Sequence, residues 1–145
     1  KTISPTYVEN CLRSVPYISE AVVFGHQRKY LTALIEIDFE TVSGWARAND
    51  IVYTGFTSLT KHPEIISLIG SASKKASEDL ARVEQIKGFR IIPKELDPED
   101  EDEPITPTRK IKRELVYEKF KDLVESMYSD KEEQLVASEI GDVLG

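Results

Sequence analysis

Residues 18–38, ISEAVVFGHQRKYLTALIEID, contain two short apolar runs separated by a polar turn. The first run ends at Gly25, and the second alternates loosely from Leu31 to Asp38. Two such runs joined by a tight polar connection are typical of an antiparallel hairpin. We therefore predict two paired strands, over residues 18–25 and 31–38, as the centre of the fold.

Helical patterns lie on both sides of this hairpin. Ser4 can cap a helix that has Pro5 as its first residue, and Pro16 ends it. Asp38 can cap a short helix that ends near residue 48. Pro63 is suited to the first position of a long helix. The apolar residues assigned to one face of that helix are Ile66, Ile69, Ala72, Ala76, Leu80 and Val83.

A third strand is predicted at Phe89–Ile92, where Pro93 ends the run, and a last helix begins near Lys112. Its inner face is predicted to carry Val116, Phe120, Leu123 and Met127. The order α-β-β-α-α-β-α predicts the α+β class, with a small mixed or antiparallel three-stranded sheet covered by helices. Residues 129–145 are predicted to be a weakly structured tail, because their apolar pattern thins; a weak helix is the alternative.

Composition excludes several classes of function. The chain has 145 residues and a formal net charge of -7, so it lacks the positive field that general nucleic-acid binding needs. Its one cysteine, Cys11, has no disulfide or metal partner and lies on an apolar stripe, which predicts a buried thiol. No apolar run approaches the ~20 residues of a transmembrane segment. The sequence opens KTISP, and we expect it to be a piece of a longer polypeptide.

Charged residues gather in two neighbouring loops. An acidic stretch, residues 95–103, has no calcium-loop spacing, and the basic stretch TPTRKIKR follows it at residues 106–113. A basic loop at the start of a helix can contact a phosphate or carboxylate, although a solvated surface is the simpler interpretation. His26 and His62 have no catalytic partner pattern, and no glycine-rich nucleotide loop or nucleophile motif is present.

Five segments, taken in order, resemble the small C-terminal domain of adenylate-forming acyl-CoA synthetases of the long-chain fatty acid branch. They are residues 1–9 (KTISPTYVE), 15–25 (VPYISEAVVFG), 28–35 (RKYLTALI), 86–90 (IKGFR) and 106–113 (TPTRKIKR). The resemblance runs from residue 1 to about 128 and implies a lid domain over residues 1–128. Arg109 stands where many relatives have glycine before the motif lysine.

The resemblance implies a catalytic role for Lys110. In this family the corresponding lysine bridges the carboxylate and the α-phosphate of ATP when the lid closes over a larger domain. After the lid rotates, the opposite face is implied to line the tunnel for the pantetheine arm of CoA. The positions implied for that face are Lys1, Thr2, Ile3, Ser4 and Gly25.

The implied partners are an N-terminal adenylation domain of the same chain, a fatty acid, ATP with Mg²⁺, and CoA, with no nucleic acid. The implied location is cytoplasmic, with any membrane contact made by other parts of the protein. The fragment alone is expected to be inactive. Two alternatives remain open at this stage: a non-enzymatic module whose basic loop binds an acidic partner, and a relative that uses another acyl acceptor.

Overall fold

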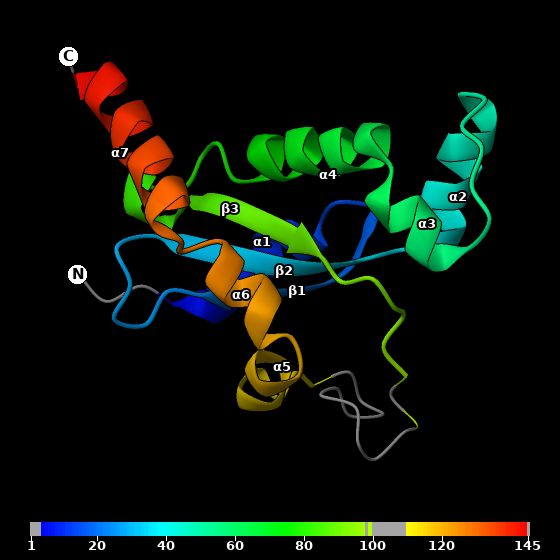
Figure 1. Ribbon diagram of the computed structural model, residues 1–145, viewed down its shortest axis with the longest axis horizontal. Helices are drawn as coiled ribbons and strands as arrows, with labels where there is room; N and C mark the ends of the chain where they lie inside the picture. The colour runs from blue at the N-terminus through cyan, green and yellow to red at the C-terminus, as the bar shows by residue number, and fades with distance from the viewer. Residues whose placement is uncertain (1–3, 98, 100–109, 145) are drawn as a thin grey trace.

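The computed structural model describes residues 4–97, 99 and 110–144 of the chain. In chain order, these form α1 (Pro5–Arg13), β1 (Ile18–Phe24), β2 (Leu31–Ile37), α2 (Phe39–Ala48), α3 (Phe56–Lys61), α4 (Pro63–Ala76), the 3-10 turn η1 (Arg82–Glu84), β3 (Ile86–Ile91), α5 (Arg113–Lys119), α6 (Lys121–Ser126) and α7 (Asp130–Leu144). Figure 1 shows them arranged around one small sheet.

The sheet has the strand order β1-β2-β3. β1 and β2 form the expected antiparallel hairpin, in which Val23 lies opposite Ala33. β3 joins the other side of β2 in the parallel direction, and Phe89 lies opposite Ala33 there. The α+β prediction and the three-stranded sheet are thus confirmed, and the sheet is mixed. The parallel pairing follows from the long helical connection, α2 to α4, that returns the chain to the same end of the sheet.

Each face of the sheet contributes to a separate hydrophobic cluster, because side chains alternate along β2. Ala33 and Ile35 belong to the first cluster, which α1, α2 and α4 cover. Leu34 belongs to the second cluster, with Val116 of α5 and Val124 of α6. In Figure 1, α6 crosses in front of the sheet while α1 lies behind it. The base of the basic loop therefore rests on one face, and α1 on the other.

The inner face predicted for the long helix was partly wrong. α4 begins at Pro63 as expected but ends at Ala76, and its buried residues are Ile65, Ile69 and Ser73. Ile66 is 43% exposed and Val83, which lies beyond the helix, is 57% exposed. The helix ends where the Ser77 hydroxyl donates to the carbonyl of Ser73 at 2.9 Å, a local bond that competes with continued helix.

The last predicted helix is in fact two. Phe120 leaves helical geometry (φ -120°, ψ 31°) and separates α5 from α6. Val124 is buried where Leu123 was expected, and Leu123 is only half-buried. Val116, Phe120 and Met127 are buried as predicted.

The C-terminal segment and Cys11 also differ from the sequence predictions. Residues 130–144, for which the sequence predicts a weakly structured tail with a helix as the alternative, form α7, and Val136 is buried. Lys29 pairs with Glu133 of α7 at 3.2 Å, and this ion pair connects α7 to the hairpin turn.

Cys11 is half-buried and not fully buried as predicted. Among the described residues, no helix has the length and apolar character required to cross a bilayer.

Candidate functional site

Lys110 lies at the surface, at the point where the described chain resumes after residue 99. Its side chain is exposed, whereas the next residue, Ile111, is half-buried and packs against the second hydrophobic cluster. α5 begins three residues after Lys110, at Arg113. The lysine is therefore held next to a packed helix start, as predicted, while residues 106–109 of the basic loop lie outside the described residues.

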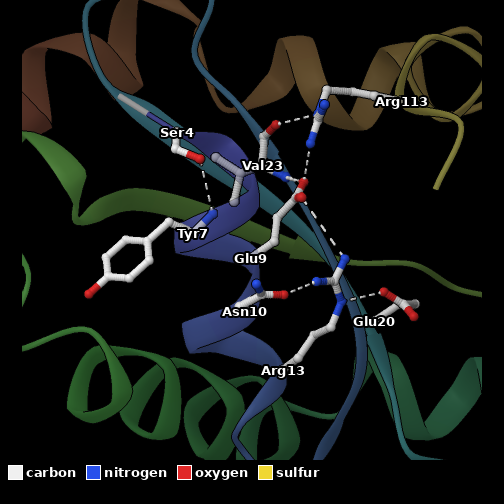
Figure 2. Close-up of polar contacts among 8 residues, drawn as sticks. All are labelled: Ser4, Tyr7, Glu9, Asn10, Arg13, Glu20, Val23 and Arg113. Atoms are coloured by element: carbon white, nitrogen blue, oxygen red, sulfur yellow. Dashed lines mark hydrogen bonds and ion pairs between the residues drawn. The ribbon is translucent and has the colours of Figure 1, made fainter. Parts of the chain in front are cut away.

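Arg113 binds the first helix and the first strand at the same time (Figure 2). Its Nη2 donates to Oε2 of Glu9 at 2.6 Å, and its Nε donates to the carbonyl oxygen of Val23 at 3.2 Å. The same Glu9 oxygen accepts the backbone N–H of Val23 at 2.8 Å. We call this closed set of contacts, formed by Glu9, Val23 and Arg113, the Glu9 clamp. It fastens the start of α5 to α1 and β1.

Glu9 is 2% exposed, and a second arginine, Arg13, lies near its carboxylate. Nη2 of Arg13 lies 3.9 Å from its other oxygen, Oε1, and Nε of Arg13 donates to buried Glu20 at 2.7 Å (Figure 2). Buried charges persist only when they are paired and hydrogen-bonded. Glu9 meets both conditions.

A hollow of about 940 Å³ lies beside the clamp. Gly25 and Phe24, at the end of β1, form one part of its lining, while Lys112 and Arg113 form another. A β-carbon on Gly25 would lie 2.1 Å from Cδ2 of Leu31, so a side chain there would force Leu31 to move. Gly25 thus borders the same hollow as Lys112 and Arg113, at the base of the basic loop.

The other implied tunnel residues are only partly placed. Ser4 is exposed and caps α1 by accepting the Tyr7 N–H at 3.4 Å, and its neighbour Pro5 lines the hollow. Lys1, Thr2 and Ile3 lie outside the described residues. A larger hollow, about 1080 Å³, lies along β3 but contains none of the predicted site residues.

The remaining polar predictions are explained by local structure. His62 caps α4, since its Nδ1 accepts the Glu64 N–H at 3.2 Å, and His26 lies in the hairpin turn. Of the acidic stretch, only residues 95–97 and 99 are described, and there the Leu96 N–H donates to buried Glu36 at 2.6 Å. Within the described ranges, no group of three or more His, Cys, Asp or Glu side chains is arranged to hold a metal ion.

Glu9 is the residue that sequence reasoning missed. The sequence offered one signal, which is that Glu9 directly follows Val8 on the buried side of α1, next to Leu12. A carboxylate at such a position requires a cationic partner. Its partner Arg113 is 104 residues away, so only the folded structure identifies the pair.

A further ion pair lies between α6 and the hairpin turn. The guanidinium of Arg28 binds Glu125 and lies 4.4 Å above the ring of Tyr128, and Tyr117 donates to Glu125 at 2.7 Å. The hydrogen bond from Arg28, and then that from Tyr117, hold the pKa of the Glu125 carboxyl below its usual value. A carboxyl with a lowered pKa in the folded state contributes stability at neutral pH, and this contribution is lost as the pH falls through that pKa.

We expect Arg28→Gln to raise the pKa of Glu125, as measured by NMR titration of its side-chain carboxyl. Tyr117→Phe should raise it less, because Arg28 is the larger cause. The difference in free energy of unfolding between the parent chain and Arg28→Gln should narrow as the pH falls below about 4.5. An unchanged carboxyl titration in Arg28→Gln would contradict the assigned pair.

Solved structures share this fold. The adenylation domain of a carboxylate reductase from Mycobacterium chelonae superposes on 88% of this chain with a TM-score of 0.65, at 19% identity and over 18% of its own length. A two-domain fragment of a Segniliparus rugosus carboxylic acid reductase, solved in complex with AMP, covers 96% of this chain with a TM-score of 0.64, again at 19% identity and over 17% of its length. The architecture is therefore one that occurs as a part of adenylation enzymes.

Residues 1–132 match the model of the family described as AMP-binding enzyme C-terminal domain, and the chain belongs to that family. It is 38% identical to the long-chain-fatty-acid–CoA ligase FadD15 of Mycobacterium tuberculosis over 130 residues, which are 89% of this chain and 21% of the relative. It is 27% identical to the peroxisomal long chain acyl-CoA synthetase 7 of Arabidopsis thaliana, over 88% of this chain and 18% of the relative. The chain thus spans about a fifth of the length of these relatives. The resemblance seen in the sequence is confirmed.

Proposed function

We propose that this chain is the C-terminal lid of an ATP-dependent, AMP-forming long-chain fatty acid–CoA ligase. The observation that carries the proposal is an exposed lysine, Lys110, held at the start of a clamped helix in a domain of the AMP-binding enzyme family. The named relatives that are ligases of long-chain fatty acids support the substrate class. The proposed cellular location is the cytoplasm.

In the first half-reaction, a carboxylate oxygen of the fatty acid attacks the α-phosphorus of ATP. The bond from that phosphorus to the bridging oxygen breaks, pyrophosphate leaves, and an acyl-adenylate forms. Negative charge gathers on the reacting oxygens, and the Lys110 ammonium can stabilise this charge without blocking in-line attack. The clamp supplies a rigid base from which the lysine reaches a phosphoryl centre built by the N-terminal domain.

In the second half-reaction, the thiol of CoA attacks the acyl carbon and AMP leaves. We propose that the pantetheine arm of CoA approaches along the end of β1, at Gly25, which borders a hollow lined by apolar side chains and by charged ones of both signs. Mg²⁺, when bound, would neutralise phosphate charge, and we assign it to ATP and the N-terminal domain.

The proposal is tested on the full-length protein by two assays. Pyrophosphate exchange into ATP should depend on an added long-chain fatty acid, and subsequent AMP release should depend on CoA. A carrier protein bearing phosphopantetheine should not replace CoA as acceptor. The proposal would be overturned by pyrophosphate exchange that does not need the fatty acid, or by formation of ADP in place of AMP. Transfer of the acyl group to the carrier protein in preference to CoA would overturn it as well. The 145-residue chain alone should show neither reaction.

A further inference from the structure

We propose that Glu9 is a positioning residue for adenylation, which acts on Lys110 through Arg113; this inference rests on the function proposed above. Two residues separate Lys110 from Arg113, so the Cα atoms of the two are three steps apart along the chain and lie at most about 10 Å from each other. Whatever fixes Arg113 therefore restricts where the lysine can go. Arg113 is fixed by Glu9 and by the backbone of Val23.

The chemistry of the clamp requires these two side chains. Oε2 of Glu9 accepts from both Val23 N–H and Arg113, while Nε of Arg113 donates to the Val23 carbonyl. A guanidinium can make two directed bonds of this kind from one rigid plane, whereas a lysine ammonium is a point charge. A glutamine at position 9 would keep the shape but lose the charge that holds Arg113.

The partners of Glu9 differ in what they restrain. Arg13 lies on the same helix as Glu9 and pairs with Glu20, so these contacts stabilise α1 and β1 only. Arg113, in contrast, belongs to the helix that follows the basic loop. Loss of Glu9 should therefore release the start of α5, and with it the base from which Lys110 projects. A displacement of about 1 Å in a catalytic group can cost up to about 100-fold in rate.

The test measures both half-reactions in the full-length enzyme carrying Glu9→Gln. We expect the kcat of adenylation to fall about 10- to 100-fold with little change in the KM for fatty acid. Thioester formation from supplied acyl-adenylate should stay within about twofold of the parent enzyme. Glu20→Gln is the matched control, since Glu20 is also a buried carboxylate and pairs with Arg13 of α1. Any loss in this control should fall equally on both half-reactions.

A double-mutant cycle with Lys110→Ala separates positioning from general destabilisation. If Glu9 acts through the lysine, Glu9→Gln should add less than about a twofold loss of adenylation in the Lys110→Ala background. Equal loss of both half-reactions in Glu9→Gln, or a loss that multiplies with that of Lys110→Ala, would overturn the inference while the proposed function stands. If Lys110→Ala itself shows no selective loss of adenylation, the proposed role of the lysine fails and this inference fails with it.

A second variant changes Arg113, the more exposed partner in the Glu9 clamp. The Arg113 side chain is 39% exposed, so Arg113→Lys is less disruptive than a change at Glu9. It should show the same selective loss of adenylation, and it decides the question if Glu9→Gln does not fold, as judged by circular dichroism. Full adenylation activity in a folded Arg113→Lys enzyme would refute the positioning role.

Discussion

Lys110→Ala in the full-length enzyme should lower the rate of acyl-adenylate formation by at least about 100-fold. A single preorganised donor to a developing oxyanion is worth about 10²–10³ in rate, and Lys110 is proposed to be such a donor. Thioester formation from supplied acyl-adenylate should largely survive, because the lysine is proposed to act only in the first step. Rapid-quench measurement of each half-reaction checks both statements.

Two companion variants sharpen this result. Lys110→Arg should also be impaired, because a planar guanidinium cannot replace a compact ammonium at a crowded phosphoryl centre. Lys75→Ala, at an exposed lysine on α4, should leave both half-reactions unchanged. Equal loss of the two half-reactions in Lys110→Ala would contradict the assignment of the lysine to adenylation.

Leu34→Ala should lower the free energy of unfolding of this chain by about 2–5 kcal/mol. Leu34 is fully buried in the central strand β2, where it joins the sheet to the cluster beneath α5 and α6. Its truncation leaves a cavity that the flanking strands cannot easily fill. Urea unfolding with an unchanged m-value would measure the loss.

Ile35→Ala and Val52→Ala are the controls for the stability measured with Leu34→Ala. Ile35→Ala, equally buried but in the first cluster, should also cost about 2–5 kcal/mol. Val52→Ala, at a side chain that is 87% exposed, should change stability by less than about 0.5 kcal/mol. A Leu34→Ala loss as small as that of Val52→Ala would show that this face is not a packed core.

The hairpin and the helix starts could be predicted from the sequence because their signals are local. Alternating side chains and a polar turn specify β1 and β2, while Ser4, Asp38 and Pro63 begin or cap helices through contacts with near neighbours. Such signals need no knowledge of the rest of the fold.

The remaining features depend on contacts between distant segments. α3 is six residues long with a glycine at its N-cap, too short for a recognisable apolar period. The break at Phe120 and the buried face of α4 are set by how these helices pack on the sheet. For the candidate site, the sequence predicts Lys110 by family resemblance. The Glu9–Arg113 pair can be found only in the tertiary structure, because the two residues are 104 positions apart in the sequence.

The Glu9 clamp also has a consequence for how copies of this domain behave in a crowded solution. β1 is an outer strand of the sheet, and outer strands with unpaired peptide groups can recruit strands from other molecules. At Val23, both the N–H and the carbonyl are already occupied by side chains. Glu9 and Arg113 therefore prevent the edge strand β1 from pairing with a strand of another molecule at Val23.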